Sequence, residues 1–396
     1  MARALYLNGS ARGHINPTLP LVGALVRRGE QVTYLSGSGM KPAIEAAGGR
    51  FLDCGPELDE FHRGYRPSGD HPFFTLMEYL LAQNDVMAKI ALARTEGMEF
   101  DYVLHDAMLG GGHTVALKLG LPAVCTCTSF ASAVLPLPDR MLQPGFHPQL
   151  DVLYHKYCPS MLAGEMKELL AGAYFQREGL NIVFTSRLLQ PGGAGFDESF
   201  RFVGPAISDR GDEDQALEAW MAGKPVLYIA MGTIHKNLSA FYRLCIEAFS
   251  GSNWAVVLAV GGKTDVTALG VIPSNMKVMP HAPQLQVLRH AKAFISHCGL
   301  NSAGEAMLFG VPIVAVPVMN DQPAVANQLV KLGAAVQLDI NKLSPEMLRK
   351  AVEDVSTQPS FVEASRCIGD SFRQAGGADA AADSVAWYHR ETTCVK

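Results

Sequence analysis

The chain has 396 residues, of which 48% are hydrophobic and 18% are charged, and its formal net charge is -5. This composition is typical of a globular protein, and the length favours two domains over a single hydrophobic core. No run of lysine and arginine is long enough to form a basic patch, which argues against nucleic acid and anionic membranes as partners.

The sequence also lacks the features of an exported or membrane-spanning protein. Its start, ARALYLNGS after Met1, is too short and too quickly polar for a signal peptide. The longest apolar stretch, around residues 311–319, is interrupted by Pro312 and Pro317 and falls short of the ~20 residues that a membrane span needs. The eight cysteines include no Cys-x-x-Cys pair and are typical of reduced thiols. We therefore expect a soluble cytoplasmic protein with no integral membrane contact.

In the first half of the chain, short apolar runs alternate with longer helical patterns. Helices are expected at residues 18–28, opened by Pro17, and at residues 41–47. Strands are expected at residues 4–7, 31–35, 102–104, 123–127 and 182–184. This alternation predicts βαβ units and a mainly parallel sheet.

A polar, acidic stretch at residues 208–215 has no apolar periodicity and is the expected domain linker. The alternation then resumes, with strands expected at residues 226–230, 255–260, 276–279, 293–296, 313–316 and 335–338. The sequence thus predicts an α/β protein with two Rossmann-like domains, over residues 1–207 and 216–377, that face each other across a cleft. Sheets of this kind bind ligands at the carboxyl ends of their strands.

A candidate for acid–base chemistry follows the first expected strand, in the segment NGSARGHINP at residues 8–17. Pro17 favours the start of a helix, and the glycines Gly9 and Gly13 allow a substrate to approach closely. A lone histidine in a loop is usually solvated or a helix cap. His14, however, lies where a strand meets a helix, and a neutral imidazole can take a proton from an alcohol.

Asp106, just after the strand at residues 102–104, is the best candidate for a carboxylate that orients His14. Strand ends in a parallel sheet lie side by side, so the sequence predicts that the two residues meet. The alternative is a metal site made by His105, Asp106 and His113. Neighbouring strand residues point to opposite faces, and no His-x-x-x-His spacing is present, so no metal is expected.

Residues 61–87 are rich in aromatic side chains and methionine and are interrupted by Pro67 and Pro72. Most such residues at helical spacing form ordinary core. Irregular segments of this composition, inserted after strands, also suit an apolar pocket for a small hydrophobic molecule. Met77, Met108 and Phe130 are the candidate lining residues.

In the second half, the segment HCGLNSAGE follows the strand at residues 293–296. Gly299 permits a tight turn, and a helix is expected to begin at Asn301 or Ser302, where free backbone N–H groups form an anion site. His297 adds a further donor. The alternative is structural, because Ser302-x-x-Glu305 is also a capping box that would fix the helix start without binding a ligand.

A second donor-rich loop, Met231-Gly232-Thr233, follows the strand at residues 226–230. Two such loops at adjacent strand ends fit a diphosphate better than a single phosphate. HAPQ stands upstream at residues 281–284 and Asp321-Gln322 stands downstream. This ordered set resembles the donor-binding signature of the family-1 glycosyltransferases, which move a sugar from a nucleotide diphosphate to a small hydrophobic acceptor.

The resemblance covers essentially the whole chain. It includes GHxNP at residues 13–17, VGP at 203–205, MGT at 231–233 and QAGG at 374–377. It implies that Thr233 and Gly299 belong to the donor loops and assigns the other donor contacts in the following order. The base is held by His281 and Gln284, the diphosphate by His297, Asn301 and Ser302, the ribose by Glu305, and the sugar by Asp321 and Gln322.

The resemblance also implies a GT-B fold, in which a final helix, about residues 378–396, crosses back onto the first domain. Trp387 and Tyr388 are the expected docking contacts of that helix. Plant members usually carry tryptophan where this chain has His281 and Leu300, so the sequence is more similar to the bacterial macrolide and antibiotic glycosyltransferases.

The implied reaction is inverting, free of metal and of any cofactor, and uses a UDP- or TDP-sugar, UDP-glucose being favoured. His14 would act as the base, and Asp106 as its partner, toward a flavonoid, phenolic or macrolide hydroxyl, giving a β-glycoside. The alternatives are a nucleotide-sugar epimerase or hydrolase, and a non-catalytic nucleotide-sugar-binding protein. The presence of both His14 and Asp106 argues against the last of these.

Overall fold

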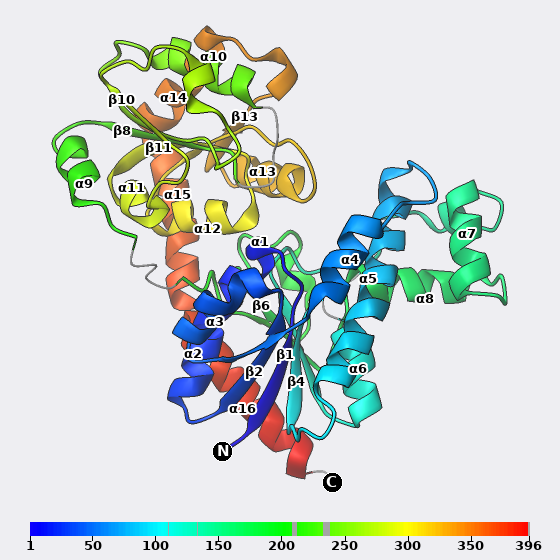
Figure 1. Ribbon diagram of the computed structural model, residues 1–396. Helices are drawn as coiled ribbons and strands as arrows, with labels where there is room; N and C mark the ends of the chain where they lie inside the picture. Colours follow the sequence, from blue (N-terminus) through cyan, green and yellow to red (C-terminus); the bar gives the residue numbers. More distant parts are fainter. Residues whose placement is uncertain (110, 133, 208–211, 233–237, 395–396) are drawn as a thin grey trace. The chain divides into compact units, whose positions relative to one another are not determined.

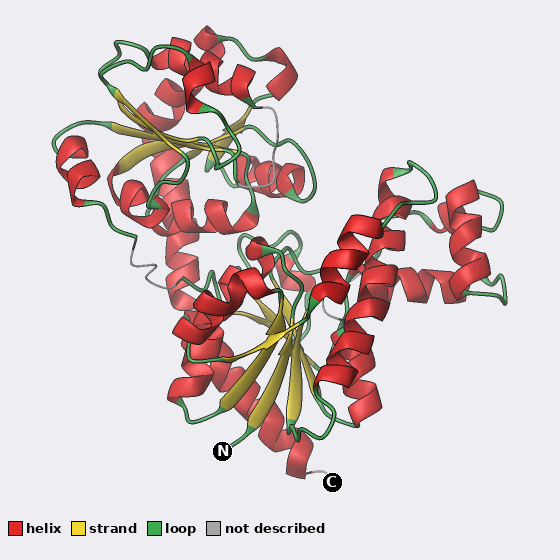
Figure 2. Ribbon diagram, in the orientation of Figure 1, coloured by secondary structure: helices red, strands yellow, loops and turns green. Residues whose placement is uncertain are grey.

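The computed structural model describes the chain except for residues 110, 133, 208–211, 233–237 and 395–396. The chain divides into two compact units. The first unit consists of Met1–Phe184, Ala194–Ala206 and Gly376–Lys396, and the second of Thr185–Gly193 and Ile207–Ala375. In each unit a sheet lies between helices (Figure 2).

Within the described part of the first unit, seven strands form one parallel sheet in the order β3-β2-β1-β4-β5-β6-β7. The strands are β1 (Arg3–Leu7), β2 (Gln31–Ser36), β3 (Arg50–Asp53), β4 (Tyr102–Asp106), β5 (Ala123–Cys127), β6 (Leu180–Val183) and β7 (Phe200–Phe202). All five strands expected here are confirmed. The sequence analysis missed β3 and β7, which are short edge strands with charged residues and therefore lack a continuous apolar run.

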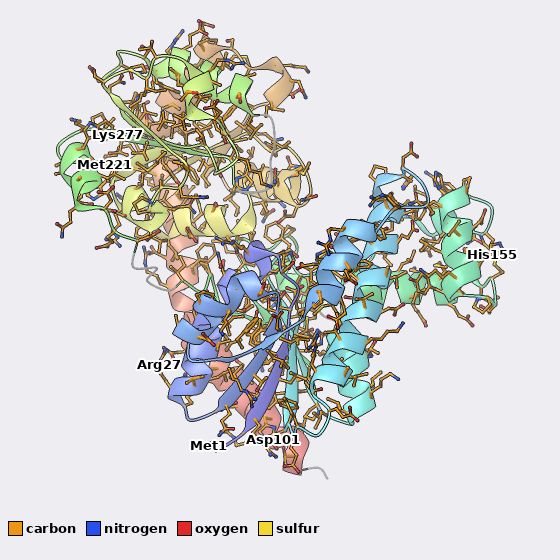
Figure 3. The ribbon with its side chains drawn as sticks, viewed as in Figure 1. Met1, Arg27, Asp101, His155, Met221 and Lys277 are labelled. Carbon is orange, nitrogen blue, oxygen red and sulfur yellow. The ribbon has the colours of Figure 1, made fainter. Side chains whose placement is uncertain are left out.

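The helices of the first unit cover both faces of this sheet. They are α1 (Arg12–Ile15), α2 (Leu19–Arg27), α3 (Lys41–Ala46), α4 (Pro56–Gly64), α5 (Pro72–Arg94), α6 (Gly112–Leu119), α7 (Pro148–Tyr157), α8 (Ala163–Tyr174) and α16 (Gly377–Cys394). Helices α5, α7 and α8 pack together on one side of the unit (Figure 1). Polar side chains such as Arg27 on α2 and His155 on α7 point outward (Figure 3).

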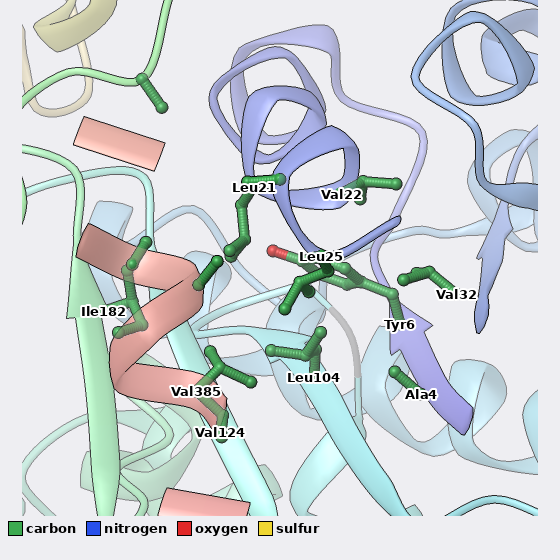
Figure 4. Close-up of a cluster of buried hydrophobic side chains, with 14 of the residues drawn as sticks. Ala4, Tyr6, Leu21, Val22, Leu25, Val32, Leu104, Val124, Ile182 and Val385 are labelled. Atoms are coloured by element: carbon green, nitrogen blue, oxygen red, sulfur yellow. The ribbon is translucent and has the colours of Figure 1, made fainter. Parts of the chain in front are cut away.

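Helix α16 returns to the first unit, as the resemblance implied. Its residues Ala381, Ala382 and Val385 have no exposed surface and pack with the sheet and α2 (Figure 4). Tyr388 continues the same stripe and packs against this core. Trp387 lies off the stripe and is 46% exposed, and it contacts the first unit through the Arg201 guanidinium of β7, 5.9 Å from the centre of its ring. The helical period places residues 381, 385 and 388 on one face and residue 387 beside it.

In the described part of the second unit, six parallel strands follow the order β10-β9-β8-β11-β12-β13. They are β8 (Val226–Ala230), β9 (Ala255–Ala259), β10 (Met276–Met279), β11 (Ala291–Ser296), β12 (Ile313–Ala315) and β13 (Ala335–Gln337). The helices are α9 (Gln215–Met221), α10 (Ser239–Phe249), α11 (Gln284–His290), α12 (Leu300–Leu308), α13 (Gln322–Lys331), α14 (Pro345–Thr357) and α15 (Pro359–Gln374). Every strand expected in this half is present.

Two boundaries differ from the sequence analysis. Residues 185–193, assigned there to the first domain, pack with the second unit, where the Ser371 hydroxyl on α15 donates to Ser186 at 2.7 Å. The expected linker, residues 208–215, lies partly outside the described residues. Its end already belongs to α9, because the Asp214 carboxylate accepts from the first N–H groups of that helix and caps it.

Candidate functional site

His14 lies in the short helix α1, between β1 and α2, and buried polar side chains hold the backbone of this segment. Asn8, directly after β1, donates from Nδ2 to the His14 carbonyl at 3.1 Å and to the Tyr34 hydroxyl at 3.2 Å. Thr18 contacts the same hydroxyl at 2.8 Å and donates to the Ile15 carbonyl at 2.7 Å. The sequence analysis missed these partners, which fix the backbone of this segment on both sides of His14.

The structure brings His14 and Asp106 together, as predicted, because His14 follows β1 and Asp106 is the last residue of the adjacent strand β4. Nδ1 of His14 is 2.9 Å from Oδ2 of Asp106, which is fully buried, whereas the His14 side chain is 26% exposed. Thr128, just after β5, places its hydroxyl 2.8 Å from His14 Nδ1 and 3.1 Å from Asp106 Oδ2. Thr128 was missed, although a polar residue after a neighbouring strand end is the signal that found Asp106.

Both carboxylate oxygens of Asp106 have hydrogen-bond partners. Its Oδ1 accepts from the backbone N–H groups of Met108 at 2.8 Å and Leu109 at 3.0 Å. Burial alone would raise the pKa of Asp106, but the contact with His14 and these two N–H groups outweigh it and lower the pKa below its usual value. An ionised Asp106 fixes the hydrogen of His14 on Nδ1, so Nε2 is the basic nitrogen of the neutral ring.

In the second unit, the two predicted donor-rich loops meet at His297. A Cβ on Gly232 or on Gly299 would lie 2.7 Å from His297 Nε2, so both positions need glycine for the ring to fit. Gly232 also has a φ of +75°, a conformation that favours glycine. The predicted contact Thr233 lies outside the described residues.

Helix α12 begins at Leu300 with Gly299 as its N-cap, one or two residues earlier than expected, and no side chain caps it. The capping-box alternative is therefore wrong. Ser302 instead accepts from the Gln284 amide at 3.3 Å, and the same amide donates to the buried Glu305 carboxylate at 2.6 Å. The Tyr228 hydroxyl donates to Gln284 Oε1 at 3.1 Å. Gln284, Ser302 and Glu305 thus form one polar group at the starts of α11 and α12.

The other predicted donor residues lie around these loops. His281 is exposed and lies over Gly262, and Asn301 is half-buried in the first turn of α12. Asp321 is exposed at the start of α13. Gln322 is buried, and its Oε1 accepts from the backbone N–H groups of residues 318 and 319 at 2.9 and 3.1 Å.

Comparison with known proteins identifies the family. The model for "UDP-glucoronosyl and UDP-glucosyl transferase" matches residues 207–368. The NDP-glycosyltransferase YjiC of Bacillus licheniformis is 33% identical, and the alignment covers 96% of this chain and 95% of the relative. The chain belongs to this glycosyltransferase family.

The glycosyltransferase also resembles enzymes named for antibiotics. The demethyllactenocin mycarosyltransferase of Streptomyces fradiae is 27% identical over 97% of this chain and 86% of its own. The crystal structure of the calicheamicin glycosyltransferase CalG4 has a TM-score of 0.81 at 28% identity and covers 98% of both chains. The fold of this enzyme is therefore GT-B, and it belongs to the macrolide-like branch of the family, as the sequence analysis expected.

Over the described residues, no group of three or more histidine, cysteine, aspartate or glutamate side chains is arranged to hold a metal ion. Among the same residues, no helix is long and apolar enough to cross a membrane.

The predicted acceptor residues lie in different surroundings. Met77 has no exposed surface and packs inside the cluster formed by α5, α7 and α8. It is therefore a core residue, and its prediction as a pocket-lining residue is wrong. Met108, two residues after Asp106, is half-buried beside the same cluster. Phe130, two residues after Thr128, is also half-buried. Met108 and Phe130 therefore remain candidates because of their places next to the His14 partners.

The Thr128 hydroxyl is expected to matter for turnover because it contacts both His14 and Asp106. A hydrogen bond to a charged group is worth about 1.5–3 kcal/mol, which corresponds to roughly 10- to 100-fold in rate. We expect Thr128→Val to lower kcat by that factor and Thr128→Ser, which keeps the hydroxyl, to stay near wild type. Steady-state kinetics of the two variants checks this, and equal kcat values would contradict it.

Proposed function

We propose that this glycosyltransferase transfers a hexose, most readily glucose from UDP-glucose, to a hydroxyl group of a small hydrophobic acceptor such as a flavonoid, phenol or macrolide. The contact between His14 and Asp106, with Thr128 against both, is the observation that carries this proposal. The donor class is supported by the similarity to an NDP-glycosyltransferase and to the UDP-glucosyltransferase family. A thymidine diphosphate sugar is the second donor to test.

In the proposed reaction, Nε2 of His14 takes the proton of the acceptor hydroxyl. The oxygen attacks the anomeric carbon from the face opposite the leaving group. The bond between that carbon and the phosphate oxygen breaks, and its electron pair leaves with the nucleotide diphosphate. Asp106 stabilises the imidazolium that forms. An α-linked donor then gives a β-glycoside, and a base of this kind contributes roughly 10²–10⁴-fold to the rate.

The donor would be held by the second unit. His281 and Gln284 would contact the base, and Glu305 the ribose. The diphosphate would lie at the start of α12, where the helix dipole favours negative charge, with His297, Gly299, Asn301 and Ser302 around it. Asp321 and Gln322 would contact the sugar. This N-terminus supplies positive potential at the diphosphate, so we propose that the reaction uses no metal and no cofactor.

The acceptor would be held by the first unit, where Met108 and Phe130 flank the partners of His14. Both side chains are apolar and large enough to contact a flat aromatic or macrocyclic surface.

We place the enzyme in the cytoplasm, a proposal supported by the seven described cysteine side chains, which are unpaired thiols.

Mass spectrometry tests the proposal. The enzyme is incubated with UDP-glucose, with a panel of phenols, flavonoids and macrolides, and with or without excess chelator. We expect a product heavier by one hexose, formed only with an acceptor and unchanged by chelator. Sugar release without acceptor would indicate a hydrolase, and sensitivity to chelator would contradict the metal-free mechanism. If UDP-glucose binds but no product forms with any acceptor, the donor would be a different sugar nucleotide.

A further inference from the structure

A second cluster of titratable side chains lies behind Asp106. His105 is fully buried on β4, and successive residues of a strand point to opposite faces of the sheet. Its Nε2 is 3.0 Å from Oε1 of Glu178, and its Nδ1 is 3.1 Å from the backbone carbonyl of Asp106. His113, half-exposed on α6, approaches the same Glu178 oxygen with Nδ1 at 2.8 Å.

Both ring nitrogens of His105 have a hydrogen-bond partner. A backbone carbonyl only accepts, so Nδ1 of His105 must carry the hydrogen of that contact. The other ring nitrogen, Nε2, contacts the Glu178 carboxylate. Burial raises the pKa of Glu178, but the hydrogen bonds and charges of His105 and His113 outweigh burial and lower it. The cluster is therefore a carboxylate held between two imidazoles.

The surroundings leave the His105 ring little room to turn. The first residue of α6, Gly112, is so close that a Cβ there would lie 2.1 Å from Cβ of His105. Glu178 is fixed in turn by the buried Asn181, whose Oδ1 accepts from the Glu178 N–H at 3.0 Å and whose Nδ2 donates to the Glu178 carbonyl at 2.8 Å. The ring is thus held at both nitrogens and against the backbone of the next helix.

The contact from His105 holds the peptide group that follows Asp106, and this peptide group determines the orientation of the Asp106 carboxylate. The backbone carbonyl of Asp106 is held by His105 on one side. On the other side, its carboxylate meets His14 and Thr128 through Oδ2 and the following N–H groups through Oδ1. Rotation of the peptide after Asp106 would break the first contact and move the N–H groups of residues 108 and 109 that hold Oδ1. Both sets of hydrogen bonds are satisfied in one backbone conformation.

We infer that His105 and Glu178 are positioning residues for the candidate base, because they hold the Asp106 peptide in the orientation that turns its carboxylate toward His14. This inference rests on the proposed role of His14 as the base. His105 and Glu178 themselves act only through Asp106, and His113 supports Glu178 from the surface side.

The test compares two substitutions of one residue. In His105→Asn, the side-chain amide can place an N–H near the position of Nδ1 and keep the bond to the Asp106 carbonyl. His105→Leu removes it. We expect kcat to fall about 10-fold in His105→Leu, which corresponds to the loss of one hydrogen bond at the upper end of the ordinary range. We expect His105→Asn to stay near wild type, with the KM for UDP-glucose unchanged in both.

Two readouts separate positioning from a merely structural role. Loss of the carboxylate contact makes an imidazole less basic, so the acidic limb of the kcat/KM profile is expected to move to lower pH in His105→Leu and not in His105→Asn. In proton NMR, the downfield resonance of the hydrogen bond between His14 and Asp106 is expected to weaken in His105→Leu and to persist in His105→Asn. This second readout does not depend on enzyme activity.

The controls make each outcome decisive. His155→Leu removes an exposed imidazole on α7 and is expected to change nothing. If His105→Leu does not fold, Glu178→Gln, which keeps the size of the side chain, takes its place. A folded variant with wild-type kcat, pH profile and downfield resonance would overturn the inference. A wild-type enzyme without transferase activity but with the expected NMR changes would instead refute only the proposed function.

Discussion

Replacement of His14 by glutamine is expected to abolish transfer while leaving donor binding intact. Glutamine has a similar reach but no basic nitrogen, so the acceptor hydroxyl would have to attack without losing its proton. We expect kcat to fall by roughly 10²–10⁴-fold, the usual contribution of a general base. The proposed donor residues belong to the second unit, whereas His14 belongs to the first. Calorimetry with UDP-glucose should therefore give an unchanged Kd.

His155→Gln is the matched control, because it makes the same chemical change at an exposed position on α7. It is expected to keep wild-type kinetics. A thermal melt of both variants verifies that the fold is retained. Full transfer activity in His14→Gln would show that another group takes the proton, and the assignment of His14 as the base would be wrong.

Replacement of Asp106 by asparagine is expected to be nearly as damaging, for a reason that the structure makes specific. Oδ1 of Asp106 accepts from the N–H groups of Met108 and Leu109, so the asparagine oxygen must take that place. Its NH₂ group then faces His14 Nδ1 and donates to it. The hydrogen of the neutral ring moves to Nε2, which leaves no base toward the acceptor, and we expect a loss in the same range, roughly 10²–10⁴-fold in kcat.

The pH dependence of stability gives a second check on Asp106. Its pKa in the folded protein is lowered, so its ionised form stabilises the fold above the unfolded pKa of about 3.9. That contribution is lost as the pH falls through the lower folded pKa, and Asp106→Asn should lack this part of the acid transition. Asp85→Asn, on the exposed face of α5, is the control and should retain it. Identical acid transitions in wild type and Asp106→Asn would contradict the lowered pKa.

Much of the fold follows from the sequence alone. Strands that are buried on both faces of a parallel sheet form short apolar runs in the sequence, and β8, β9, β11 and β12 were predicted for that reason. The meeting of His14 and Asp106 was also predictable, because residues that follow adjacent parallel strands lie at the same edge of the sheet. Edge strands β3 and β7, which are short and carry charges, gave no such pattern.

Only the tertiary structure decided which side chains support the candidate site. Thr128 is 114 residues from His14 in the chain, and His105 and Glu178 are 73 residues apart. Whether such residues touch depends on strand register and on the packing of helices against the sheet, which hydrophobic periodicity does not specify. The burial of Met77 was also decided by the tertiary structure. The composition of residues 61–87 suited a pocket, but the position of Met77 on α5 buries it in the core. A sequence pattern determines which face of a helix or strand is apolar. The hydrogen-bond partners of its polar residues depend on which other elements pack beside it in the folded protein.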